Sequence, residues 1–335
     1  MSSQSFDLEE KRLIKEVQKR KAGLVLIQLP EGLKPLGPRL AAAVETTGAL
    51  AILSADPCYG ACDLATAEAE RLGADLIVHY GHSEMLRQKA FSTLYIEAKA
   101  KISVKDAVRR AIPHLEAWRR IGLVTTVQHV HKLDEAKKVL LEAGKVVAVG
   151  NAGRLKYAGQ VIGCDYSNAK AVSKEVDAFL FVGGGRFHAI GVTLATAKPT
   201  IAADPYERKA FSIESEARRI LKKRWASIHE ATQAKKVGVL VGLKAGQKRL
   251  DLALRIKESV ESAGKKAIIL ALKEITPEAL MQFPTIGAFV NTACPRLSLD
   301  DEGGFRKPLL TPDEMLVVLG KLRWEELCQK GWFES

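Results

Sequence analysis

The sequence lacks the features of a membrane or secreted protein. Its apolar runs, such as residues 24–29 and 178–182, fall far short of the roughly 20 residues that a membrane-spanning helix requires. Residues 1–20 are polar and charged, without the apolar stretch of a signal peptide. We therefore expect a soluble, cytoplasmic protein.

Motifs that bind phosphates or nucleic acids are also absent. The chain has no P-loop, no G-x-G-x-x-G between a strand and a helix, no zinc finger and no RNA-recognition signature. Its 51 basic residues exceed the 39 acidic ones, for a net charge of +12, but they are spread over several expected helices. This excess favours an acidic partner. Because the excess basic residues do not form one continuous stripe, we expect no direct binding of nucleic acid.

Three segments of the chain do repeat one plan, in which an apolar strand is followed by a helix and further strands. Their first strands are expected at residues 23–29, 121–127 and 236–241. Continuous apolar strands that alternate with helices are typical of parallel sheets covered on both faces. The sequence therefore predicts an α/β fold of three similar small domains, each a parallel sheet flanked by helices. These domains are expected at residues 1–118, 119–230 and 231–335.

The other expected elements follow the same alternation. Helices are expected at residues 38–47, 64–72, 134–143, 189–197, 248–263 and 325–330. Further strands are expected at residues 49–53, 74–80, 92–97, 145–149, 177–182, 199–203, 266–272 and 287–291. Ligands of open α/β sheets bind beyond the carboxyl ends of the strands, so the loops there are candidate sites.

Cysteine is scarce, and its five positions are Cys58, Cys62, Cys164, Cys294 and Cys328. An odd number of cysteines in a chain without a secretion signal argues against a disulfide framework. Cys328 lies in the expected C-terminal helix and is interpreted as a small buried apolar residue. The other four follow strands, on loops rich in glycine, proline and aspartate.

Cys62, Cys164 and Cys294 give each expected domain one thiol at a strand end. If the domains meet around a common centre, the three sulfurs can converge there. Three thiolates suit a [4Fe–4S] cluster with one open iron, and they suit structural zinc poorly. A zinc site that combines Cys58 and Cys62 with His79, His82 or His188 is the alternative.

Four motifs in this order resemble those of the archaeal 2-(3-amino-3-carboxypropyl)histidine synthase family of diphthamide synthesis. They are Gln-Leu-Pro-Glu-Gly-Leu at 28–33, Asp-Pro-Cys-Tyr-Gly-Ala-Cys-Asp at 56–63, Gly-Gln-Val-Ile-Gly-Cys-Asp at 159–165 and Asn-Thr-Ala-Cys-Pro-Arg at 291–296. The resemblance implies that Cys62, Cys164 and Cys294 bind the cluster. Cys62 is chosen over Cys58 because it matches the Tyr-Gly-Ala-Cys part of the first motif.

The resemblance also implies an activity. Such an enzyme transfers the 3-amino-3-carboxypropyl group of S-adenosylmethionine to C2 of a histidine in translation elongation factor 2. A reduced [4Fe–4S] cluster breaks the bond between sulfur and the γ-carbon, and methylthioadenosine is released. This is the first step of diphthamide biosynthesis, and it requires an electron donor. Archaeal members of the family act as homodimers, so we expect a homodimer.

S-Adenosylmethionine needs a cradle for its carboxylate and a slot for its adenosine. The candidate residues are Gln28, Glu31, Gly32, Gly183, Gly184, Gly185, His188 and Arg296. The three consecutive glycines follow a strand and precede a helix, so their amides can hold an anion or form a plain turn. His82 and His188 are candidates for moving protons.

Three other interpretations remain open from the sequence. Quinolinate synthase also places one cysteine from each of three α/β domains around a cluster, but it does not use S-adenosylmethionine. A zinc-stabilised basic protein that binds RNA or the ribosome would contain zinc and no iron. A non-catalytic partner subunit of the diphthamide enzyme is the third, and the presence of all three matched cysteines argues against it.

Overall fold

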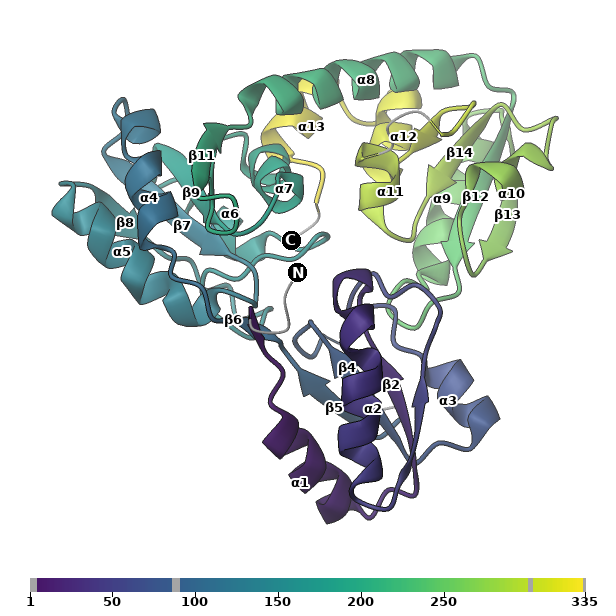
Figure 1. Cartoon of the computed structure of the whole chain (residues 1–335). Helices are drawn as coiled ribbons and strands as arrows, with labels where there is room; N and C mark the ends of the chain where they lie inside the picture. The colour runs from purple at the N-terminus through teal and green to yellow at the C-terminus, as the bar shows by residue number, and fades with distance from the viewer. Residues whose placement is uncertain (1–4, 86–90, 301–303, 334–335) are drawn as a thin grey trace.

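The computed structural model describes residues 5–85, 91–300 and 304–333. They form three mainly parallel sheets with helices around them, and the sheets surround a common middle (Figure 1). A short antiparallel pair, β1 (Phe6–Asp7) with β6 (Lys99–Ala100), lies between the first sheet and the second. The prediction of an α/β fold built on parallel sheets is confirmed.

The first sheet has the strand order β3-β2-β4-β5, and all its strands are parallel. Its strands are β2 (Leu24–Gln28), β3 (Leu50–Leu53), β4 (Leu76–Tyr80) and β5 (Thr93–Ile96). Alternate side chains of β2 enter different cores, as the pleat of a strand requires. Val25 and Ile27 pack with the helices α1 (Glu10–Arg20) and α2 (Gly37–Glu45), whereas Leu26 packs with α3 (Thr66–Leu72). The 3-10 helix η1 (Glu31–Leu36) connects β2 to α2.

The second sheet has the order β11-β10-β9-β7-β8. Its strands are β7 (Arg120–Thr125), β8 (Val146–Ala148), β9 (Ala178–Val182), β10 (Thr200–Asp204) and β11 (Lys209–Ser212). Its helical segments are α4 (Lys105–Ala111), η2 (Pro113–Leu115), η3 (Val130–Lys132), α5 (Leu133–Glu142), α6 (Ser167–Val172) and α7 (Phe187–Thr196). Phe179 and Phe181 pack with α6 and α7 on one face, and Leu180 and Val182 pack with α4 and α5 on the other.

The third sheet has the order β13-β12-β14-β15, again with parallel strands. Its strands are β12 (Lys236–Gly242), β13 (Lys266–Leu272), β14 (Ala288–Asn291) and β15 (Leu309–Leu310). The helices that follow these strands are α9 (Leu250–Ser262), α10 (Pro277–Met281), α11 (Pro295–Leu299), α12 (Pro312–Val318) and α13 (Trp324–Lys330). Val239 packs with α9 and α12, and Leu240 packs with α10 on the opposite face.

All three sheets therefore share one strand order, with the second strand of each unit beside the first and the third on the other side. Every strand expected from the sequence is present within a few residues. The antiparallel edge strand β11 and the two-residue strands β1, β6 and β15 were not predicted. None of them has the continuous apolar run on which the other predictions depend.

The helix α8 (Glu214–Thr232) connects the second sheet to the third (Figure 1). Its first half contributes Ala217 and Ile220 to the core of the second sheet, and its second half contributes Ile228 and Ala231 to that of the third. The chain then returns at its end, because Phe333 packs in the second-sheet core. The second and third sheets are thus joined at two places.

The expected domain boundaries stay a prediction. The helix α4 precedes residue 118, yet Ala107 and Val108 share a core with Ile121 and Leu180 of the second sheet. Among the helices in the described parts of the chain, none has both the length and the apolar character that crossing a bilayer requires.

Candidate metal centre

Loops from the carboxyl ends of all three sheets contact one another. Gln128, after β7, donates from Nε2 to the carbonyl of Gly81, after β4, at 2.6 Å. Gly246, after β12, donates its amide to the carbonyl of Cys62, after β3, at 2.7 Å. In sheets of this strand order, the carboxyl ends are where ligands bind. The three sheets therefore bring their ligand-binding edges to one place.

The thiols of Cys62, Cys164 and Cys294 are neighbours in this place. Burial is the first cause that raises the pKa of Cys164 to about 12, and the thiols of Cys62 and Cys294 are the next. Burial also raises the pKa of Cys294, with a further contribution from Cys62. The structure thus brings together the three cysteines that the sequence singled out, one from each sheet.

The three thiols are more exposed to solvent than that of Cys58. Cys62, Cys164 and Cys294 are half-buried, whereas Cys58 is buried, at 2% exposure. Cys328 is half-buried on α13, where it packs beside the second-sheet core. Burial raises the pKa of all three thiols, so a cation bound among them would favour the loss of their protons.

Local hydrogen bonds hold two of the three cysteine loops. A tight turn holds Cys164, in which the main chains of Ile162 and Asp165 bond each other at 3.1 and 3.2 Å. Cys294 caps α11, and Asn291 donates from Nδ2 to its carbonyl at 2.7 Å. The loop of Cys62 depends on contacts from other parts of the chain.

The loop after β12 of the third sheet holds Cys62 most closely. Gln247 donates from Nε2 to the Cys62 sulfur at 3.4 Å. A Cβ atom at Gly246 would lie 2.6 Å from the Cys62 Cα, so only glycine permits this approach. This loop was not among the sites predicted from the sequence. The loop follows the first strand of its unit, and Glu31 and Gly32 occupy the same position in the first unit. This shared position could have identified the loop as a candidate site.

A buried ion pair between Lys244 and Asp63 also holds the loop of Cys62. The Lys244 ammonium lies 3.0 Å from Oδ2 of Asp63 and 2.8 Å from Oε1 of Glu274, and it is 4.2 Å from the centre of the Tyr59 ring. These contacts join residues 59–63 of the first sheet to the loops after β12 and β13. The position of Cys62 is therefore set by the packing of the first sheet against the third.

Gln28, a predicted cofactor residue, has a positioning role in the structure. Its Nε2 donates to the carbonyl of Asp63 at 2.7 Å, and its Oε1 accepts from the amide of Ala65 at 3.2 Å and from Nδ1 of His79 at 2.8 Å. The amide is thus fully oriented by the loop of Cys62 and the end of β4. Contact between Gln28 and a cofactor stays a prediction.

Two other candidates, Glu31 and Gly32, face solvent on η1. Glu31 pairs with Lys34 at 2.9 Å, and this hydrogen bond is the first cause that lowers the pKa of Glu31. A Cβ at Gly32 would meet no atom within 4 Å. These two residues therefore lie on the open rim of the site.

The three consecutive glycines form the turn between β9 and α7. Gly185 has φ of +72°, which favours glycine, and it donates its amide to Oδ2 of Asp204 at 2.8 Å. Gly183 is buried against the ring of Phe181, and Gly184 is exposed beside Tyr206. The turn directs the first residues of α7, Phe187 and His188, toward the other sheets.

Basic side chains from the three sheets also meet near the thiols. Burial is the first cause that lowers the pKa of His188 to about 3, and the charges of Arg296 and His82 add to it. These three residues come from α7, from the start of α11 and from the turn after β4. His188 is therefore neutral at pH 7.

Arg296 has one donor that is free within the described residues. Its Nε donates to Oδ2 of Asp300 at 2.6 Å and its Nη2 to the carbonyl of Phe187 at 2.9 Å. The guanidinium lies flat against the Phe187 ring, with its carbon 3.7 Å from the ring centre. Its Nη1 is buried and has no partner in residues 5–85, 91–300 and 304–333. A buried, unpaired cationic donor beside the Cys294 thiol suits a bound anion.

Comparisons with known proteins give one result over almost the whole chain. A family model described as a diphthamide synthesis protein matches residues 29–328. The 2-(3-amino-3-carboxypropyl)histidine synthase of Pyrococcus horikoshii is 40% identical over 317 residues, covering 94% of this chain and 91% of that protein. Subunit 1 of the synthase of Schizosaccharomyces pombe is 33% identical over 343 residues, covering 99% of this chain and 78% of that protein.

A solved structure is similar over the same length. The crystal structure of Dph2 from Pyrococcus horikoshii with a 4Fe-4S cluster has a TM-score of 0.87 and 38% identity, and covers 95% of this chain and 92% of that chain. The family match at residues 29–328 includes Cys62, Cys164 and Cys294.

Proposed function

Because this chain belongs to the diphthamide synthesis family, we infer that it is a 2-(3-amino-3-carboxypropyl)histidine synthase, an iron–sulfur transferase that acts in the first step of diphthamide biosynthesis. The meeting of three thiols from three sheets is the observation that carries this inference to the site. Family membership sets aside the quinolinate-synthase-like reaction and the zinc-stabilised RNA-binding protein. Neither accounts for a match over the whole chain.

The residues present fit a [4Fe–4S] cluster. Cys62, Cys164 and Cys294 offer three soft sulfur donors, each from a separate loop and each half-buried. Each sulfur would bind a different iron, which leaves one iron without a protein ligand. When bound, the cluster supplies the electron that cleaves the sulfur–γ-carbon bond of S-adenosylmethionine.

Arg296 is the residue that we assign to the carboxylate of S-adenosylmethionine. Its Nη1 is a buried, unpaired cationic donor, which is the kind of group that binds a carboxylate. The ring of Phe187 holds the guanidinium in place. His188 stacks on Phe181 with 5.8 Å between ring centres, and its depressed pKa keeps it uncharged beside the thiols. It adds no second positive charge to the site.

The variant Arg296→Lys tests this assignment. Lysine keeps the charge but loses the planar fork, so the KM for S-adenosylmethionine is expected to rise about tenfold or more, with iron content unchanged. Steady-state formation of methylthioadenosine measures KM, and iron analysis of the same preparation is the control. An unchanged KM would place the carboxylate elsewhere.

The acceptor that we propose is C2 of one histidine in translation elongation factor 2. The net charge of +12 supports docking of an acidic protein and should affect the rate of association most. We further propose that the enzyme is a cytoplasmic homodimer that receives its electron from a separate reductase. The exposed apolar side chains of Leu254 and Ile268, on α9 and β13, offer surface for a second copy.

Transfer to the acceptor tests the proposed function. The protein, reduced with dithionite without oxygen, is incubated with S-adenosylmethionine and purified elongation factor 2. One aminocarboxypropyl group is expected on one histidine of the factor, with equimolar methylthioadenosine, and none on a factor in which that histidine is replaced. Release of methylthioadenosine with an unmodified factor would show that the acceptor is another molecule.

A further inference from the structure

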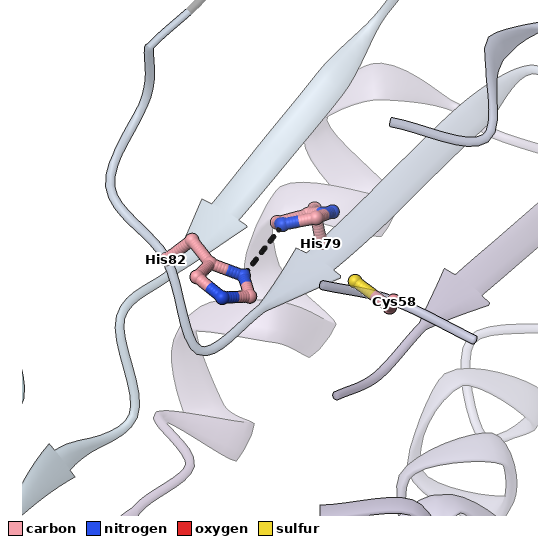
Figure 2. Close-up of side chains that lie close together, drawn as sticks. All are labelled: Cys58, His79 and His82. Atoms are coloured by element: carbon pink, nitrogen blue, oxygen red, sulfur yellow. Dashed lines mark hydrogen bonds between the residues drawn. The ribbon is translucent and has the colours of Figure 1, made fainter. Parts of the chain in front are cut away.

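We propose that Cys58, His79 and His82 form a second metal site, separate from the three cluster thiols, that binds a divalent zinc ion. The Cys58 sulfur and one ring nitrogen of each histidine lie within 4.8 Å of one another. Figure 2 shows the Cys58 sulfur directed toward the two rings, and the rings facing each other. All three residues come from the first sheet, at the ends of β3 and β4. The proposal is independent of the transferase function.

The donor set is one that zinc prefers. Zinc binds imidazole nitrogen at about 2.0–2.1 Å and thiolate sulfur at about 2.3 Å, so tetrahedral ligand atoms stand about 3.3–3.8 Å apart. The two facing nitrogens, Nε2 of His79 and Nδ1 of His82, are 3.0 Å apart. A shift of about one ångström by the sulfur completes three corners of a tetrahedron. The fourth corner is left to water, as in catalytic zinc sites with three protein ligands.

A second observation concerns the orientation of His79. Gln28 donates to the Asp63 carbonyl and accepts from the Ala65 amide, so its Oε1 must face Nδ1 of His79. His79 therefore carries its proton on Nδ1, and its Nε2 accepts a hydrogen bond from Nδ1 of His82, which a zinc ion between the two nitrogens would replace. Metal-binding histidines are commonly oriented in this way, by an oxygen that accepts from the other ring nitrogen.

The surrounding charges also favour a cation. The carboxylates of Asp63 and Glu31 lie close enough to Cys58 to add to the rise of its thiol pKa, after burial as the first cause. A zinc ion with one thiolate and two neutral imidazoles has a net charge of +1, which these two carboxylates can offset. Binding releases the proton of Cys58.

Such an ion would join the end of β4 to the loop that carries Cys62. Cys58 lies at the start of that loop, and the histidines flank the turn at Gly81. The ion would fix one side of the loop while Lys244 fixes the other. This assigns a role to Cys58, which the cluster does not need.

Metal analysis of the cluster-loaded protein tests the proposal. Protein purified without oxygen is given equimolar zinc, passed through a weak chelator and measured for zinc and iron. One zinc per chain is expected in the unaltered protein and in Cys328→Ala. Cys58→Ala is expected to bind zinc at least about 100-fold more weakly while retaining its iron, because it loses a direct ligand. Zinc retained in Cys58→Ala, or absent from the unaltered protein, would overturn the proposal.

Two further measurements distinguish the loss of a metal ligand from a loss of folding. Cobalt in place of zinc should give a thiolate-to-cobalt absorption band, which the near-isosteric Cys58→Ser should abolish. The triple variant Cys62→Ala/Cys164→Ala/Cys294→Ala should lose iron but keep zinc and the cobalt band. Loss of the cobalt band in the triple variant would show that the metal uses the cluster thiols, and would also overturn the proposal. Failure of the transferase assay alone would leave these readouts unchanged.

Discussion

Replacing any one of Cys62, Cys164 and Cys294 by alanine is expected to abolish activity and remove most of the bound iron. Each cysteine is the one thiol that its sheet brings to the shared centre, and no other cysteine is half-buried there. Two thiolates hold an iron–sulfur cluster poorly, because a second iron then lacks a protein ligand. Iron and sulfide analysis of protein purified without oxygen checks the first effect, and methylthioadenosine formation checks the second.

Cys58→Ala and Cys328→Ala are the matched controls for these variants. Cys58 lies only four residues before Cys62, and Cys328 lies on α13, away from the three loops. Both variants should keep their iron, and Cys328→Ala should also keep its activity. Full turnover in Cys164→Ala would refute the assignment of the ligands, and loss of iron in Cys58→Ala would mean that the first motif uses its other cysteine.

Glu314→Ala is expected to lower the free energy of unfolding by about 3–5 kcal/mol, because it leaves a buried guanidinium without its carboxylate. Arg224, in the middle of α8, donates to both oxygens of Glu314 at 2.8 and 2.7 Å. It also donates to the carbonyls of Ser298 and Leu309, at 2.7 and 2.8 Å. The pair is buried, with exposed side-chain fractions of 8% and 0%. Urea unfolding of the two proteins measures the difference.

Arg218→Ala, on the same helix, is the control for this stability effect. Arg218 pairs with Glu214 at 3.1 Å, but the two side chains are 66% and 61% exposed, so its loss should cost less than about 1 kcal/mol. The double variant Arg224→Met/Glu314→Leu should be more stable than Glu314→Ala, because it leaves no buried charge. Equal stability of Glu314→Ala and the unaltered protein would contradict the role of this pair in holding α8 to the third sheet.

The strands could be predicted because their signal is local. Buried parallel strands such as β4 and β9 are continuous apolar runs, and the helices between them end at glycines, as at Gly73 and Gly144. The edge strand β11 has no such run, since one side of it is open. Its antiparallel pairing with β10 depends on neighbours that the local sequence does not specify.

The contacts that orient the site could not be predicted in the same way. The placement of Cys62 depends on Gly246 and Gln247, more than 180 residues further along the chain by sequence number. Arg224 lies among the basic residues of α8 and has the composition of a solvent-facing helix, yet its partner Glu314 is 90 residues away. Such pairs are set by how the sheets pack, and one sequence does not contain that information.

The most direct test of the central claim is Mössbauer spectroscopy of protein enriched in iron-57, with and without S-adenosylmethionine. The claim is that three thiols from three sheets hold one cluster and leave one iron free. It predicts about four irons per chain in a [4Fe–4S] signal, of which one changes when S-adenosylmethionine is added. A cluster whose irons are all unaffected by S-adenosylmethionine, or a protein that binds no cluster with all three cysteines intact, would contradict the account.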